Sequence, residues 1–229
     1  MTPFQRYGVL LVAVWLLIVV TRFRRSKIVL MGGLFAVGLY TLVALVRADV
    51  SMRELGLRIP ISWLTTIGFA VAWLALMLAY SPAADRLATR WVNEPPNLEA
   101  FRVLQESRSK LIAGIAVAWV LGGFLEELAF RGIVLQSMEA LASGWLVGPL
   151  AIGIAVCTAA AGAGLIHLYQ GLRAAIIVTQ LSVLFGLLFV VNGHNLWAVM
   201  LCHGLYDTVA FIRFAKKKSK YSKLGADEP

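Results

Sequence analysis

The chain has 229 residues, of which 60% are hydrophobic and only 14% are charged. A soluble domain has about 45–50% apolar and about 25% charged residues, so water is not the main solvent of this protein. Its 21 Lys and Arg residues outnumber its 12 Asp and Glu residues, but most of the basic residues flank apolar runs, as topology signals and contacts with anionic lipids do. The composition predicts an integral membrane protein and argues against nucleic acid as a partner.

Seven stretches of the chain approach the roughly 20 apolar residues that a helix needs to cross a bilayer. Their approximate bounds are 7–20, 28–46, 62–80, 111–130, 145–166, 174–191 and 196–214. The first stretch is not followed by a small-residue cleavage site, so we interpret it as a retained span and not as a signal peptide. We predict an all-α polytopic bundle of about seven transmembrane helices, which forms one membrane domain over residues 1–229.

The connections between these stretches carry unequal charge. If the N-terminus is outside, the cytoplasmic segments hold most of the 21 basic residues, including the lysine-rich tail. The positive-inside rule therefore predicts an N-out, C-in protein in the inner or plasma membrane of the cell. The longest connection, residues 81–110, contains three prolines and mixes charged with apolar residues, which predicts an amphipathic segment at the membrane interface.

Three charged residues lie within or next to the fourth stretch: Glu126, Glu127 and Arg131. Charged residues are costly at bilayer depth, roughly 2.5–3.5 kcal/mol for Asp, Lys or Arg, so function is the first explanation for them. Glu127 and Arg131 are four residues apart and share a helix face, which predicts an ion pair. Glu126 is turned about 100° away and lacks that partner, so we predict Glu126 as general base with Glu127 and Arg131 as its support. The alternative is a charge cluster at a helix end.

Two of the three histidines also lie in apolar runs. His167 follows a series of Ala and Gly residues that would let a neighbouring helix approach closely. His203 precedes Asp207 by four residues, so the carboxylate is on the same face and can orient the imidazole. Taken singly, each histidine is better explained as a hydrogen-bonded residue between helices, whereas together with Glu126 the two histidines favour a catalytic site. His194 falls in an Asn and Gly-rich turn and is expected to be a solvated loop residue.

Together these residues resemble the motifs of the CAAX prenyl protease and bacteriocin-processing (CPBP) intramembrane proteases. The first motif, two glutamates followed after three residues by arginine, stands as Glu126-Glu-Leu-Ala-Phe-Arg131. The third, a histidine four residues before Asn or Asp, stands as His203-Gly-Leu-Tyr-Asp207. The second has phenylalanine four residues before a histidine, whereas Ala163 stands there before His167. The resemblance covers roughly residues 111–214, the motif-bearing core. The segment Glu54-Leu-Gly-Leu-Arg58 is similar to a short sequence that often precedes this region in the family.

The resemblance implies an intramembrane endopeptidase that acts on a membrane-associated protein or peptide, or on a C-terminal tail. In it, Glu126, His167 and His203 would activate water for peptide hydrolysis, with Glu127, Arg131 and Asp207 in supporting roles. Ala163 is expected to change the shape of the pocket without removing the catalyst. With the bounds above, His167 falls about 10–15 Å from the depth of Glu126, so helix tilt or a shifted boundary must bring them together.

The sequence is compatible with a site that contains a metal ion and with one that does not. The histidines could orient the water and stabilise the oxyanion without metal, or they could complete a zinc site with a carboxylate. The chain has no HExxH element, so we favour a glutamate-dependent protease with no cofactor. Two other classes of function remain open: a non-proteolytic membrane scaffold or immunity protein of the same fold, and a small transporter whose Glu and His residues relay protons.

Overall fold

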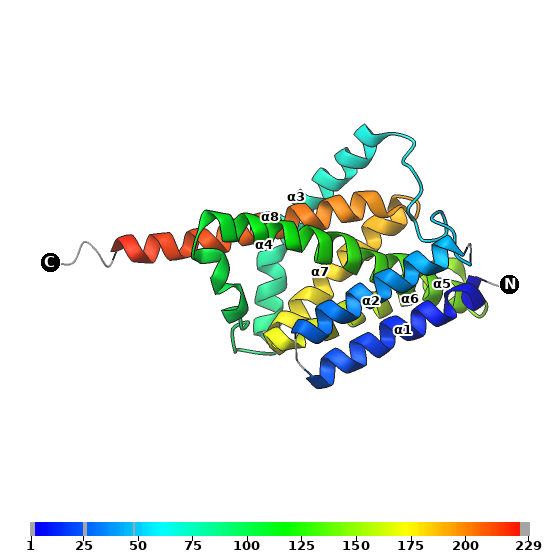
Figure 1. Cartoon of the computed structure of the whole chain (residues 1–229), viewed down its shortest axis with the longest axis horizontal. Helices are drawn as coiled ribbons and strands as arrows, with labels where there is room; N and C mark the ends of the chain where they lie inside the picture. The colour runs from blue at the N-terminus through cyan, green and yellow to red at the C-terminus, as the bar shows by residue number, and fades with distance from the viewer. Residues whose placement is uncertain (1–2, 25–26, 48, 225–229) are drawn as a thin grey trace.

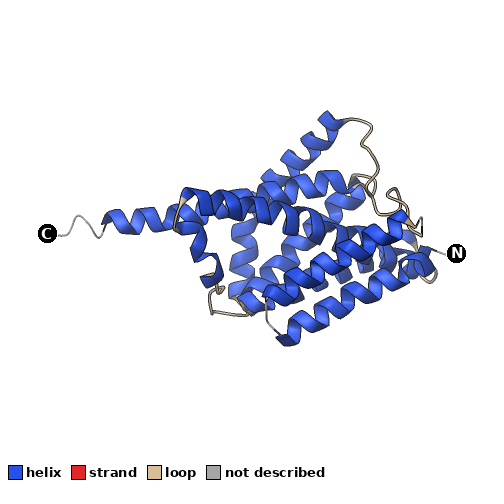
Figure 2. Cartoon of the chain, viewed as in Figure 1, coloured by secondary structure: helices blue, strands red, loops and turns tan. Residues whose placement is uncertain are grey.

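The computed structural model describes residues 3–24, 27–47 and 49–224, and within them all regular structure is helical (Figures 1 and 2). The elements in chain order are α1 (Pro3–Arg24), α2 (Lys27–Val46), α3 (Trp63–Thr89), η1 (Glu99–Gln105), α4 (Arg108–Ala118), η2 (Trp119–Glu126), η3 (Leu128–Leu135), α5 (Gln136–Ala142), α6 (Gly148–Ile166), η4 (His167–Gln170), α7 (Leu172–Val191) and α8 (Leu196–Leu224). This confirms the predicted all-α class.

Five helical segments in the described part are long and apolar enough to cross a membrane. They are Trp63–Thr89, Arg108–Ala142, Gly148–Gln170, Leu172–Val191 and Leu196–Lys216. Two shorter apolar helices, Gly8–Val20 and Met31–Val46, pack side by side as α1 and α2 (Figure 1). Many large apolar side chains, such as Phe35 and Leu64, are exposed on the outside of the bundle, as expected where lipid is the solvent. The chain is an integral membrane protein, and the number of seven spans stays a prediction.

The third helix ends later than the sequence indicated, because α3 continues through Pro82 to Thr89. The expected connection over residues 81–110 is therefore wrong for its first nine residues. Tertiary contacts stabilise this extra length: the Ser81 hydroxyl lies 2.6 Å from the Tyr206 hydroxyl, and Asp85 pairs with Arg173 at 2.7 Å. The remaining connection contains η1, a short 3₁₀-helix beside α4 and α8.

Small residues allow α6 and α7 to pack closely, as the Ala and Gly series before His167 predicts. A Cβ built on Gly164 would stand 1.9 Å from the Thr179 hydroxyl oxygen and 2.8 Å from the Ala175 carbonyl oxygen. Both of these atoms belong to α7, so any side chain at residue 164 would push the two helices apart. This close contact fixes the position of η4, which begins at His167, directly after α6.

At one end of the bundle the connection between α2 and α3 docks onto the hairpin between α7 and α8. The Leu196 amide donates to the Gly56 carbonyl at 2.8 Å, and the Asn195 side chain donates to the Arg58 carbonyl at 3.0 Å. His194 is half-buried here and its Nε2 lies 3.0 Å from Glu139 Oε2. His194 lies in the turn after α7, as expected, and it also contacts Glu139 of α5 across the end of the bundle.

Candidate active site

The helix that carries the two glutamates runs unbroken over Arg108–Ala142, so they lie well inside it. Its turns are π-helical in η2 and η3, a form that often occurs at functional sites. A Cβ on Gly122 would stand 2.9 Å from Asp207 Oδ2, and one on Gly123 would stand 3.3 Å from the backbone of α8. The absence of side chains at these two glycines lets α8 bring its polar residues against the acidic helix.

Glu127 and Arg131 form the ion pair that their spacing predicts. Arg131 Nη1 donates to Glu127 Oε1 at 3.1 Å, and both side chains are buried. Arg131 Nη2 also donates to the carbonyl and hydroxyl oxygens of Ser182 on α7, at 2.9 and 2.6 Å. The guanidinium lies 5.3 Å from the centre of the Phe185 ring. The ion pair, the hydrogen bonds and the aromatic ring thus offset the free-energy cost of removing the Arg131 guanidinium from water.

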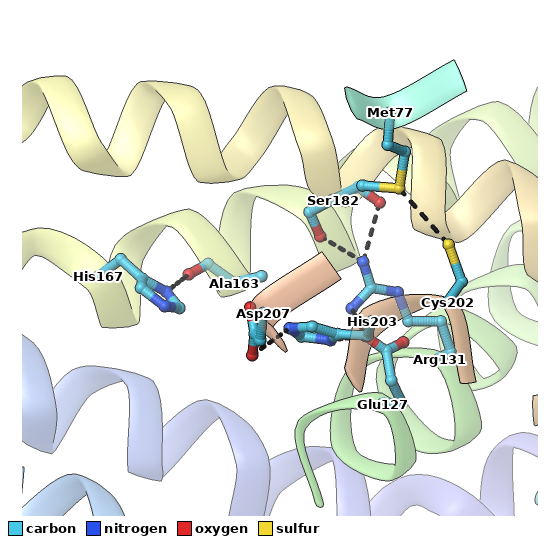
Figure 3. Close-up of polar contacts among 9 residues, drawn as sticks. All are labelled: Met77, Glu127, Arg131, Ala163, His167, Ser182, Cys202, His203 and Asp207. Carbon is cyan, nitrogen blue, oxygen red and sulfur yellow. Dashed lines mark hydrogen bonds and ion pairs between the residues drawn. The ribbon is translucent and has the colours of Figure 1, made fainter. Parts of the chain in front are cut away.

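His203 of α8 lies between two carboxylates (Figure 3). Its Nδ1 donates to Glu127 Oε1 at 2.5 Å, and its Nε2 lies 3.5 Å from Asp207 Oδ2. The proton is assigned to Nδ1 because a carboxylate only accepts hydrogen bonds. The ring stacks on Phe185 with 4.7 Å between centroids. Glu127, and not only the expected Asp207, therefore orients this imidazole.

His167 occupies the first position of η4, at the end of α6. Its Nδ1 donates to the Ala163 carbonyl oxygen at 2.8 Å, so Nε2 is the ring nitrogen left for other partners. This hydrogen bond uses the main chain of Ala163, so it does not depend on which side chain stands in the second motif. In Figure 3 Asp207 lies between His167 and His203, and all three side chains line the same cavity.

Residues from three helical segments meet at one cavity. Its volume is about 460 Å³, and a smaller cavity of about 90 Å³ adjoins the same residues. Both cavities are lined by Glu126, His167, His203 and Asp207. His167 therefore reaches the same cavity as Glu126, despite the difference in depth that the sequence suggested. Within the described residues, Glu126 makes no hydrogen bond or ion pair, so its carboxylate faces the cavity without a protein partner.

Sequence reasoning missed two contacts of this site, Glu127 with His203 and Arg131 with Ser182. Both contacts join different helices, and spacing along one helix carries no information on them. Ser182 did offer a signal, since it is a polar residue inside the apolar run of α7, and such residues serve as hydrogen-bond partners between helices. The smaller cavity also reaches Arg131 and Ser182, so this hydrogen-bonded group forms its wall.

In the described part of the chain, no three His, Cys, Asp or Glu side chains converge closely enough to hold a metal ion. The polar residues at the cavity are instead joined in pairs: Glu127 with His203, His203 with Asp207, and His167 with a main-chain carbonyl. These groups can accept a proton, orient a small polar molecule and donate hydrogen bonds. Those are the abilities that general acid–base chemistry requires.

The comparison with protein families gives a match to part of the chain. Residues 108–209 match the family model described as type II CAAX prenyl endopeptidase Rce1-like. The matched segment contains Glu126, His167, His203 and Asp207, together with Glu127 and Arg131. No curated protein and no solved structure matches the chain. The match confirms the family resemblance that the motifs predict.

Proposed function

We propose that this protein is a glutamate-dependent endopeptidase of the membrane, because residues 108–209 match the family model described as type II CAAX prenyl endopeptidase Rce1-like. The family itself supports proteolysis of the CAAX type in general terms. The observation that carries the finer proposal is the shared cavity, where the carboxylate of Glu126 meets two imidazoles from other helices. The substrate is a membrane-associated protein or peptide whose scissile bond enters this cavity.

Glu126 is the general base in this proposal. Its carboxylate takes a proton from a water molecule while the water oxygen forms a bond to the carbonyl carbon of the scissile peptide. The same carboxyl group then returns the proton to the nitrogen as the carbon–nitrogen bond breaks, which releases an amine and a carboxylate. The surroundings of Glu126 support this role, because none of the described residues forms an ion pair with its carboxylate, which stays available to accept the proton.

The two histidines have different tasks because their ring nitrogens have different partners. His167 donates from Nδ1 to a carbonyl, so its neutral form offers Nε2 as an acceptor that orients the attacking water. His203 donates from Nδ1 to Glu127, and in its protonated form it offers an Nε2–H to the developing oxyanion. Glu127, itself held by Arg131, keeps the ring in place through Nδ1, and the carboxylate of Asp207, 3.5 Å from Nε2, stabilises the protonated form of His203.

The proposal is tested by comparing new peptide termini in membranes that contain the wild-type protein or Glu126→Gln. We expect at least one membrane protein to be cut by the wild type, and we expect cutting by Glu126→Gln to fall by about 10²–10⁴-fold, since the amide cannot accept the proton. Mass spectrometry of the termini measures both, and immunoblotting confirms equal amounts of protein in the membrane. His167→Ala and His203→Ala are expected to lose cleavage in the same assay.

Glu139→Gln is the matched control, because Glu139 lies on the same long helix but pairs with His194 away from the cavity. This variant is expected to cut as the wild type does. Full cleavage by Glu126→Gln would contradict the assignment of the base. If the wild type produces no new termini, the alternative of a non-proteolytic scaffold or immunity protein is favoured instead.

A further inference from the structure

The cavity has a polar end near Gly122, beside His203 and Asp207, and an apolar end near Gly114, beside Leu104. The polar end is formed by Glu126, His167, His203 and Asp207, all within the segment that matches the protease family. The apolar end receives five side chains that precede residue 108: Met31, Leu34, Leu98, Phe101 and Leu104. The first two belong to α2, and the others belong to η1 and the residue before it. The matched segment also lines the cavity with apolar residues such as Val117, Leu121 and Val178, so the residues before 108 supply only part of its apolar wall.

The η1 part of this wall is fixed to the helices around it. The Phe101 ring packs on Phe211 of α8 with 5.5 Å between centroids, and the Gln105 side chain donates to the Phe214 carbonyl at 2.9 Å. Before η1, the Asn97 amide donates to the Gln170 carbonyl at 2.7 Å, which ties the connection to η4. Contacts at both ends of the segment therefore hold Phe101 in a defined position at the cavity.

Leu104 is the most enclosed residue of η1 and lies against a glycine of α4. It is 5% exposed, and a Cβ on Gly114 would stand 2.2 Å from one of its methyl carbons. Gly114 itself also lines the cavity. The space that Leu104 fills is therefore defined from both sides, so the size of the apolar end depends on these two residues.

We propose that Phe101 and Leu104 form a specificity subsite, which accepts an apolar side chain of the substrate residue next to the scissile bond. This inference rests on the proposed protease function. The occupant is apolar because the wall consists of Leu, Phe and Met, and a charged group placed against them would lose its water without gaining a partner. It lies next to the scissile bond because the same cavity continues to Glu126 and the histidines.

The test uses a peptide taken from a cut site of the wild-type protein and varied only at the residues that flank the bond. Each flanking residue is changed in turn to Ala, Val, Leu and Phe, and kcat/KM is measured for the purified full chain in detergent micelles. Phe101→Ala and Leu104→Ala enlarge the subsite. At one flanking position we expect the preference for Phe over Ala to rise about tenfold or more, the order that a few methylene groups contribute in an apolar pocket.

Val103→Ala is the matched control, because Val103 is on the same 3₁₀-helix, is 42% exposed and does not line the cavity. Its ratios should equal those of the wild type. Gly114→Ala, which pushes Leu104 from the opposite side, should also change the ratios without any change in η1. A merely structural role would lower kcat/KM equally for all peptides, and that result, or unchanged ratios in the Phe101, Leu104 and Gly114 variants, would overturn the subsite. If the wild type cuts no peptide, the protease proposal itself fails.

Discussion

Glu126 and Glu127 are neighbours in the chain, yet their side chains have opposite surroundings. Glu127 has no exposed surface and is held by Arg131 and His203. Glu126 is half-buried and borders the cavity with no ion pair among the described residues. The one-residue offset on a helix turns one carboxylate toward its partners and the other toward the cavity. The same chemical group can therefore serve folding at one position and a reaction at the next.

The two glutamates should differ sharply when each is truncated. Glu127→Ala leaves the buried guanidinium of Arg131 without its ion-pair partner, so we expect a loss of about 3–5 kcal/mol in the free energy of unfolding. Glu126→Ala removes no ion pair and should leave stability close to that of the wild type. Thermal unfolding in detergent micelles, followed by tryptophan fluorescence, measures both variants.

The double variant Glu127→Ala with Arg131→Met provides the control for this prediction. It removes both charges, so it should recover much of the stability that Glu127→Ala loses, although His203 would remain without its Nδ1 acceptor. A melting temperature of Glu127→Ala equal to that of the wild type would show that Arg131 does not depend on Glu127. The prediction would then be wrong.

For contacts between individual residues, the sequence predicts those along one helix and misses those between helices. The spacing of Glu127 and Arg131 predicted their ion pair, because residues four apart share a face. The contact of Glu127 with His203 crosses from one helix to another, and no periodic pattern reports such a crossing. The same reason explains why Ser182 was not assigned. Apart from their placement at the cavity, the roles of Glu126, His167 and His203 stay proposals.

Among the elements, α6 and α7 depend most visibly on the absence of side chains. Gly164 faces the Thr179 hydroxyl and a main-chain carbonyl of α7, whereas Gly153 on the same helix has no atom within 4 Å of its built Cβ. A side chain is therefore excluded at residue 164 but can be accommodated at residue 153. One allows close packing of helices, and the other faces open space.

Alanine at these two positions should give opposite results. Gly164→Ala forces α6 and α7 apart, so we expect a loss of about 1–3 kcal/mol in stability and a shift of η4, which carries His167. Gly153→Ala should be neutral or should stabilise by up to about 1 kcal/mol, since alanine is the better helix former. Melting temperatures of the two purified variants decide this. Equal stability of both variants and the wild type would contradict the packing argument.

Hydrophobic runs were sufficient to find the five long and two shorter apolar helices of the described residues, but not their ends. The extension of α3 to Thr89 was missed because Pro82 suggests a helix end, and its cost is offset by contacts with α7 and α8 that only the folded chain provides. The helix through Glu126 also ends later than residue 130, the end of its apolar stretch, because it continues to Ala142. Local composition sets the elements, and tertiary contacts set their length.

For the whole molecule, the connections gather at two ends of the bundle. The α2–α3 connection, the end of α5 and the α7–α8 hairpin meet at one end, through contacts such as Gln136 to the Glu54 carbonyl and Leu196 to Gly56. The connection after α3 meets η4 at the other end through Asn97 and Gln170. In the orientation predicted from the basic residues, the first end would face outward and the second would face the cytoplasm.

Cysteine labelling tests this orientation. Met52 and Arg102 are exposed at the two ends, and the native Cys157 is replaced by Ser to remove its exposed thiol. In sealed cells, a membrane-impermeant maleimide should label Met52→Cys but not Arg102→Cys. After permeabilisation both should react, while the buried Cys202 remains unlabelled. Labelling of only Arg102→Cys in sealed cells would mean that the N-terminus faces the cytoplasm.

The contacts of Arg131 connect helices that the chain supplies separately. One guanidinium holds Ser182 of α7 and, through Glu127, His203 of α8, so three helices share a single group of hydrogen bonds. None of them can rotate or slide without breaking bonds that the others need. The region around the cavity should therefore open as one cooperative unit, which is either fully assembled or not assembled at all.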